Sequence, residues 1–156
     1  MLAPGPYSRG TLNRAADPPP YLVLLDSPHV LRGDVRHDLV PSVPAALLVV
    51  LGARGDWVAR DKIGALFWPD ASDADARHHL RITLHRARQL ARRWAVEDRL
   101  LSDRHRLRLD LPCDVVSFRQ ALSAEDWARA LALHRAPLCS AFGLRGFAAL
   151  DEWLAH

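Results

Sequence analysis

The sequence predicts an α+β protein, in which a winged helix-turn-helix domain precedes a partial α-helical region of the TPR-like kind. Three patterns predict this fold class. A short apolar helix closed by Trp68-Pro69 is followed by a long amphipathic helix over 72–93, the order that a helix-turn-helix requires. Leucines alternate with polar residues over 99–111, as in a β-hairpin. From Asp114 onward, helical patterns of mixed charge replace both.

The N-terminal part divides into a tail and short strands. Residues 1–20 are rich in proline and glycine and show no hydrophobic period, so we expect a flexible tail. We assign residues 21–112 to the winged-helix domain. It opens with an apolar, β-prone run from Tyr21 to Leu25, and turn residues at 26–28 and 32–34 then separate short strands.

Two helices are expected before the long one. The first covers 41–52, with Pro44 in its first turn and Gly52 as its stop, and a loop over 52–58 follows. Four of its apolar side chains should face the core: Ala46, Leu47, Val50 and Leu51. The second covers 60–68; its apolar positions are Ile63, Leu66 and Phe67, and Pro69 closes it.

The helix over 72–93 has an apolar side and a basic side. Ser72 can cap its N-terminus, with Asp73 and Asp75 in the first turn, where the helix dipole favours them. The apolar side holds Ala76, Leu80, Thr83, Leu84, Ala87, Leu90 and Ala91. The polar side and its flanks hold Arg77, His78, Arg81, His85, Arg86, Arg88, Gln89 and Arg92. A solvated helix face usually mixes charge signs, yet no acidic residue occurs from 77 to 93.

Positive charge is concentrated in one segment. The 156 residues carry a net charge of +3, from 21 basic and 18 acidic residues. Between Arg77 and Arg108 there are ten arginines and three acidic residues, a net charge of +7, so the remainder of the chain carries −4. Such clustering is the footprint of a polyanionic partner. The alternative interpretation is a basic surface helix in an arginine-rich protein.

The hairpin over 99–111 should have a basic tip. Leu101, Leu107, Leu109 and Leu111 alternate with polar residues around the turn 102–105. A hairpin directly after a recognition helix is a wing, and its tip would carry Arg104, His105 and Arg106 for contact with phosphates or the minor groove. The alternative is an edge hairpin that arginine keeps soluble.

Residues 113–156 predict three further helices, over 114–122, 123–134 and 147–155. Ser123 and Asp126 give a capping-box pattern before the second of these helices. Helix-pair repeats need neighbours to bury their apolar faces. We therefore expect this segment to be the start of a helical domain that the chain does not complete.

Several function classes have little support in the sequence. No apolar run is long enough to cross a bilayer, and the N-terminus lacks the pattern of a signal peptide. Cys113 and Cys139 lack metal or redox spacing, which favours free thiols and a cytoplasmic, nucleoid-associated protein. Neither a cofactor nor a metal is implied, and we do not expect an enzyme.

An alternative in a different class is a metal-dependent hydrolase. Four histidines could supply its ligands: His78, His79, His85 and His105. However, no carboxylate or thiol shares their helix face, and the surrounding arginines would repel a cation. No Ser/His/Asp order or glycine-rich phosphate loop accompanies them.

Seven short motifs resemble a bacterial regulator family. They are the strand segment from Leu24-Leu25 to Gly33, the helix segment 46–51 (ALLVVL), the segments 60–70 (RDKIGALFWPD) and 76–88 (ARHHLRITLHRAR), the pair Asp114-Val115 with Phe118, the run 131–138 (LALHRAPL), and 152–154 (EWL). In this order they resemble the SARP-type transcriptional activators, which join an OmpR-type winged helix to a bacterial transcriptional activator domain. The resemblance covers about residues 22–156. Ala59 stands where the family usually has a capping serine, and Ala87 where it usually has leucine.

The resemblance implies a transcription factor that recruits RNA polymerase subunits at promoters and binds direct repeats of double-stranded DNA as a pair of protomers. The residues alone imply binding to double-stranded DNA, with the helix 72–93 in the major groove. Arg81 and His85 would then face base edges. The phosphate contacts would come from Arg77, Arg86, Arg88, Arg104 and Arg106. The rival hypothesis is a protein-interaction adaptor that keeps this fold without binding DNA.

Overall fold

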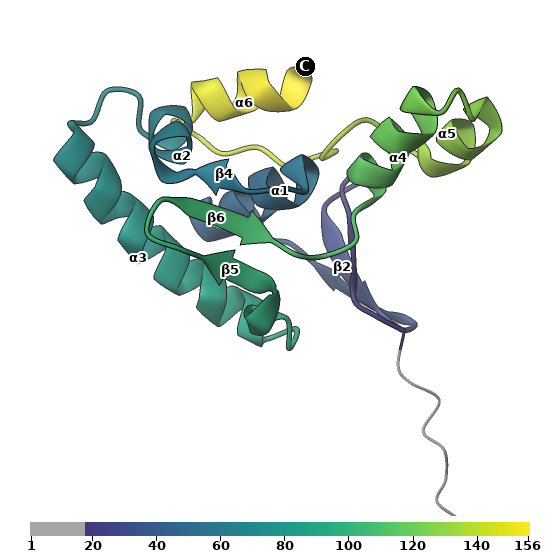
Figure 1. The fold of residues 1–156 in the computed structure, drawn as a ribbon, viewed down its shortest axis with the longest axis horizontal. Helices are drawn as coiled ribbons and strands as arrows, with labels where there is room; N and C mark the ends of the chain where they lie inside the picture. Colours follow the sequence, from purple (N-terminus) through teal and green to yellow (C-terminus); the bar gives the residue numbers. More distant parts are fainter. Residues whose placement is uncertain (1–17) are drawn as a thin grey trace, which may run out of the picture.

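The computed structural model describes residues 18–156, so most of the expected tail over 1–20 lies outside the described residues. The elements of the first half are β1 (Tyr21–Val23), β2 (His29–Arg32), β3 (Val35–Asp38), α1 (Val43–Arg54), β4 (Val58–Ala59), α2 (Arg60–Phe67) and α3 (Asp73–Arg92). A 3₁₀ turn η1 (Glu97–Arg99) leads to β5 (Leu100–Ser102), β6 (Arg106–Leu109), α4 (Asp114–Ser123), α5 (Trp127–Leu133) and α6 (Ala148–Ala155). The protein therefore has a mixed α and β fold, as expected (Figure 1).

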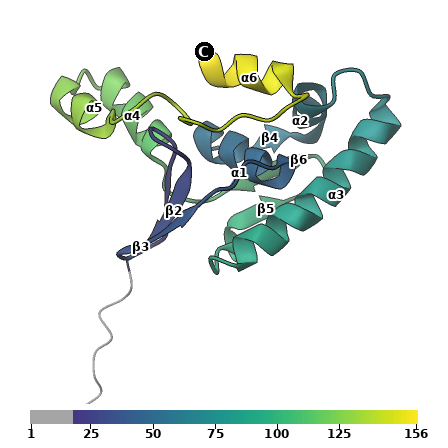
Figure 2. The same cartoon turned by 180° about the vertical axis from the view of Figure 1, so that it is seen from behind.

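Two small antiparallel sheets frame helix α1. The N-terminal sheet has the order β1-β2-β3, with Tyr21 opposite Leu31 and Val30 opposite His37. The second sheet has the order β4-β6-β5. From behind, α1 lies in the middle of the molecule, between the N-terminal sheet and α3 (Figure 2). The strands expected over 21–38 and the hairpin expected over 99–111 are thus both present.

Helix α1 is the central element of the core. Nine consecutive residues, 45–53, are buried, because other elements cover the helix on every side. Gly52 is not the stop that the sequence predicts: the helix continues to Arg54, and Gly55 ends it in the left-handed conformation with φ 69°. Gly52 instead permits close packing, since a Cβ at this position would meet the side chain of Leu22.

The expected loop over 52–58 is also partly wrong. Val58 and Ala59 form β4, which pairs with β6 through Val58 opposite Leu107 and Ala59 opposite Arg106. The wing is therefore a three-stranded sheet and not an isolated hairpin. Since α2 begins at the next residue, the first helix of the helix-turn-helix starts directly from the wing sheet.

The C-terminal segment packs onto the first half. The three helices expected there are present as α4, α5 and α6, but Asp126 caps α5 in place of the expected Ser123. Helix α6 lies against α2, and its Leu150 is 1% exposed within the same apolar cluster as α1 and α3 (Figure 1). By contrast, Trp127 and Leu131 of α5 are 61% and 77% exposed.

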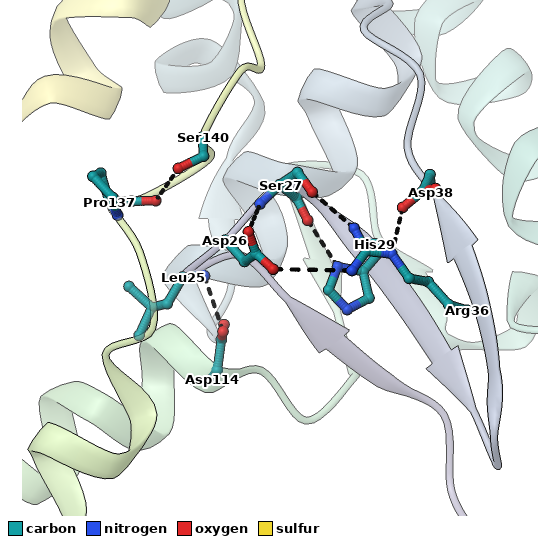
Figure 3. Close-up of polar contacts among 9 residues, drawn as sticks. All are labelled: Leu25, Asp26, Ser27, His29, Arg36, Asp38, Asp114, Pro137 and Ser140. Carbon is teal, nitrogen blue, oxygen red and sulfur yellow. Dashed lines mark hydrogen bonds and ion pairs between the residues drawn. The ribbon is translucent and has the colours of Figure 1, made fainter.

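A buried carboxylate joins the two halves. Asp114, the first residue of α4, accepts hydrogen bonds from the backbone N–H groups of Leu24 and Leu25 at 2.8 and 2.9 Å, and one of these bonds is drawn in Figure 3. The backbone N–H of Leu22 donates to the carbonyl of Pro112 at 2.9 Å, and that of Cys139 donates to Leu24 at 2.7 Å. The segments around Pro112 and Cys139 thus both bond to the strand β1 or its extension.

Candidate nucleic-acid interface

The long helix α3 is positioned by its apolar side. Ser72 caps it by accepting a hydrogen bond from the backbone N–H of Asp75 at 3.2 Å, as predicted. Its fully buried residues are Leu80, Thr83, Leu84, Ala87 and Ala91, and they pack mainly against α1 and α2. Ala76 and Leu90, also predicted for this side, are half-buried. The opposite side of α3 therefore faces solvent along its whole length (Figure 2).

The basic side of α3 is exposed as a continuous surface. Seven predicted contact residues are exposed there: Arg77, His78, Arg81, His85, Arg86, Gln89 and Arg92. Arg88 is half-buried. Arg92 has a weak ion-pair contact, 3.9 Å from Glu97, which lies beyond the end of the helix. This surface consequently offers cations and neutral donors, the groups that duplex DNA accepts.

Two polar pairs order the centre of this face. Arg81 Nη2 lies 3.0 Å from His78 Nδ1, one turn earlier on the helix. Gln89 Nε2 lies 3.2 Å from His85 Nε2, in a second pair along the same side. Both pairs are exposed, so the same donors can turn outward to a base edge or a phosphate oxygen.

Arg88 braces the helix against the wing. Its Nη2 donates a hydrogen bond of 2.5 Å to the hydroxyl of Ser102, at the end of β5. One donor of Arg88, a predicted phosphate ligand, is thus already bonded to Ser102. The helix and the wing sheet lie side by side (Figure 1). A guanidinium has five N–H donors, so others stay available to a phosphate.

The wing tip is organised around Asp103. Its Oδ1 accepts from the backbone N–H groups of His105 and Arg106 at 2.8 and 2.7 Å. The backbone bond from His105 and the ion pair with Arg106, at 2.9 Å, hold the pKa of the Asp103 carboxyl below its usual range. Arg106 also lies 4.8 Å above the ring of Trp57. Arg104 and His105 are exposed, and within residues 18–156 the Arg104 side chain has no hydrogen bond or ion pair.

Arg60 is a site residue that the sequence analysis missed. Its Nε and Nη2 donate to the carbonyl of Asp103 at 3.1 and 3.0 Å, and its own N–H donates to the carbonyl of His105 at 2.9 Å. The first residue of α2 therefore fixes the wing tip. Helix periodicity places Arg60 at a helix start but cannot reveal a partner more than 40 residues away.

The described part of the structure contains no cluster of side chains that could bind a metal ion. Within residues 18–156, no three His, Cys, Asp or Glu side chains lie where they could hold one ion. His79 instead lies beside Trp68, with ring centroids 5.4 Å apart, and next to His78 at 6.0 Å. The four histidines of the hydrolase alternative are therefore spread along α3 and the wing.

A second polar cluster, at the end of the N-terminal sheet, contains Asp, Ser and His side chains but closes a turn (Figure 3). His29 Nδ1 lies 2.7 Å from the backbone carbonyl of Ser27, not from its hydroxyl. That hydroxyl accepts from Arg36 at 2.8 Å, and Arg36 also pairs with Asp38 at 2.6 Å. No nucleophile and base face each other here, so the cluster fixes the β1–β2 turn.

Comparison with solved structures shows that the fold of this chain is similar to that of EmbR. The structure of Mycobacterium tuberculosis EmbR in complex with a low-affinity phosphopeptide matches with a TM-score of 0.58 at 17% sequence identity. The match covers 87% of this chain and 41% of the EmbR chain, so this chain spans less than half of EmbR. No family model and no curated protein matches the sequence.

The EmbR match extends over the helical segment as well as the winged helix, since 87% of 156 residues exceeds either part alone. The likeness of fold to a solved protein therefore includes both the first half of the chain and the helices after it. Separately, none of the described helices combines the length and apolar character that crossing a membrane requires.

Proposed function

We propose that this protein is a DNA-binding transcription regulator of the SARP kind. One observation carries the proposal: the exposed basic side of α3 lies beside an exposed basic wing tip, and both rest on a common scaffold. The fold similarity to EmbR, itself a regulator of that kind, supports it. The partner would be double-stranded promoter DNA, and the protein would be located in the cytoplasm, associated with the nucleoid.

In this mechanism α3 enters the major groove and the wing lies on the neighbouring backbone or minor groove. Arg81 and His85 occupy the middle of the exposed face, where base edges would be read. Arg77 and Arg86 on α3 and Arg104 on the wing would neutralise phosphates. Arg88 and Arg106 would hold the helix and wing in register as well as contact the backbone.

Transcription activation requires more than DNA binding. By resemblance, RNA polymerase subunits and a second protomer on direct repeats would be the further partners. Residues 21–112 would bind DNA, and residues 113–156 would bind the protein partners. The exposed Trp127 and Leu131 of α5 support a protein contact there.

Salt-dependent binding tests the proposal. Fluorescence anisotropy with mixed-sequence duplex DNA should give a fall of log affinity with log salt, at a slope of about −0.9 per phosphate neutralised. The variant Arg77→Gln/Arg104→Gln should flatten that slope by about 1.8. A matched control, Arg135→Gln/Arg145→Gln, removes two exposed charges from the helical segment and should leave the slope unchanged.

The adaptor hypothesis makes the opposite prediction. A protein of this fold without DNA contacts would bind duplex DNA weakly, and the two double variants would behave alike because only net charge would matter. Equal slopes for both variants would therefore overturn the proposed DNA face.

A further inference from the structure

Two adjoining cavities lie between the winged helix and the C-terminal helices. The larger, of about 580 Å³, is bounded by α1, β4, α2, α4 and α6. The smaller, of about 460 Å³, lies between α1, α4 and the C-terminal end. They share three lining residues: Arg54, Arg119 and Trp153. Each volume falls in the range of small-molecule sites, about 300–1,000 Å³.

The charges of the larger cavity favour an anion. Three cationic side chains line it, Arg54, Lys62 and Arg119, against one carboxylate, Asp56. Among residues 18–156, no ion pair joins Asp56 to any of these cations. Asp56 instead accepts the backbone N–H of Trp57 at 2.7 Å. The positive excess is thus not neutralised by the protein.

Two of the cations are held in place. Arg119 donates to the carbonyls of Ala53 and Arg54 at the C-terminal end of α1, so its guanidinium is fixed at the junction of the two cavities. Arg54 lies 5.6 Å from the ring centre of Trp153, which α6 supplies. Lys62, in the first turn of α2, is exposed and makes no hydrogen bond or ion pair within the described chain.

The remaining wall is apolar and aromatic. Val50, Ile63, Leu66 and the rings of Trp57 and Trp153 line the larger cavity. A flat apolar body can stack on the indoles while an acidic group meets the cations. We propose that this cavity binds an amphipathic organic anion, with an aromatic or apolar body and one carboxylate, sulfonate or phosphate group.

Such a ligand would touch the elements that carry the basic face. Trp57 lines the cavity, and its ring also lies 4.8 Å from the guanidinium of Arg106 at the wing tip. Helix α2, which braces α3, forms another wall. The binding itself does not depend on the proposed DNA function, so it is measured on the full chain without DNA.

Two fluorescent probes of matched shape test the site. 8-Anilino-1-naphthalenesulfonate carries one sulfonate, and N-phenyl-1-naphthylamine has the same rings without it. We expect saturable binding of one sulfonate probe per chain, about tenfold tighter than the neutral probe, since a charge-assisted contact accounts for about that factor. Comparable affinities for the two probes, or no saturable binding, would overturn the proposal.

Three variants locate the probe. Lys62→Glu should weaken the sulfonate probe about tenfold and leave the neutral probe nearly unchanged. Ala149→Phe, which fills the cavity from α6, should abolish binding of both probes while the fold, followed by circular dichroism, persists. Trp127→Ser removes the exposed apolar residue of α5 and should change neither affinity.

The variants also define failure. If Trp127→Ser removes the fluorescence, the probe binds the α5 surface and the cavity assignment is wrong. If Ala149→Phe abolishes binding but Lys62→Glu has no effect, the cavity binds apolar molecules without regard to charge, and the anionic class is wrong.

Discussion

The guanidinium of Arg88 and the hydroxyl of Ser102 are 2.5 Å apart, and this hydrogen bond joins the exposed helix α3 to the wing strand β5. It is the only side-chain hydrogen bond between these two elements within residues 18–156. A second tie, from Arg60 to the carbonyl of Asp103, fixes the wing tip from the other side. Helix and wing thus form one surface with a fixed spacing.

A double-mutant cycle on Arg88→Ala and Ser102→Ala measures the first tie. Because the bond is exposed, we expect a coupling of about 0.5–1 kcal/mol in the free energy of unfolding. Ser102→Ala should preserve the salt slope of DNA binding, since it removes no charge, whereas Arg88→Ala should flatten it. Denaturant unfolding and anisotropy report the two quantities, and a coupling of zero would show that the tie does not hold the wing.

Base reading and phosphate contact should separate between α3 and the wing. Arg81→Ala should cost about 1–3 kcal/mol on the best site and relax the preference at one base pair. Arg104→Ala should weaken binding to all sequences about equally. Selection from a random duplex library compares the two variants. A changed motif for Arg104→Ala together with an unchanged motif for Arg81→Ala would reverse the assignment.

The two sides of α3 should differ in stability. Leu84 is buried against the core, so Leu84→Ala should lower the free energy of unfolding by about 2–5 kcal/mol. The neighbouring His85 is exposed, and His85→Ala should change it by less than about 0.5 kcal/mol. Urea unfolding gives both values, and equal losses would mean that the helix register is different.

The carboxylate of Asp114 should be needed for the junction of the two halves. It accepts the backbone N–H groups of Leu24, Leu25 and Val115 at 2.8–2.9 Å and is buried. Asp114→Ala leaves these donors without an acceptor and should cost about 2–5 kcal/mol, measured by denaturant unfolding. Asp70→Ala, at an exposed turn, is the control and should stay within about 0.5 kcal/mol. Similar losses for both variants would contradict the role of Asp114.

Both thiols should be unreactive in the folded protein. Burial is the main cause that raises the pKa of Cys113 to about 12 and that of Cys139 to about 12, from an ordinary value of 9.0. The native thiols therefore stay protonated where the unfolded ones ionise. Their contribution to stability is complete below pH 9 and declines as the pH rises from about 9 toward 12. A thiol-reactive disulfide reagent at pH 8 should react slowly with native protein and fully in denaturant; rapid native reaction would contradict the burial.

The elements with strong periodicity could be predicted from the sequence. Helix α3 follows the predicted wheel, with its cap at Ser72, because an apolar stripe and a capping serine are local properties. The alternating leucines likewise predict β5 and β6. Nine of the eleven predicted site residues lie on α3 or β6, and Arg104 and His105 lie in the turn between β5 and β6. Ten of the eleven are exposed. Their contact with DNA stays a prediction.

Long-range partners could not be predicted in the same way. Strand β4 has two residues, too few for a period, and it exists because β6 supplies a partner almost 50 residues later. Gly52 ends no helix, because α1 continues to Arg54, and the glycine instead packs against the side chain of Leu22. Asp114 resembles a simple helix start until the backbone of Leu24 and Leu25 is placed beside it.

The bonds that Asp114 and Cys139 make to the residues directly after β1 also set an order of events during synthesis. Leu24 is synthesised early, but its N–H donates to the carboxylate of Asp114, 90 residues later in the chain. Its carbonyl accepts from the N–H of Cys139, which is synthesised later still. Contacts of such separation form late because the intervening chain must first be closed into a loop. When α3 and the wing have been synthesised, Leu24 therefore still lacks both of these hydrogen-bond partners. Much of residues 113–156 must be synthesised before the packing that supports the basic face of α3 is complete.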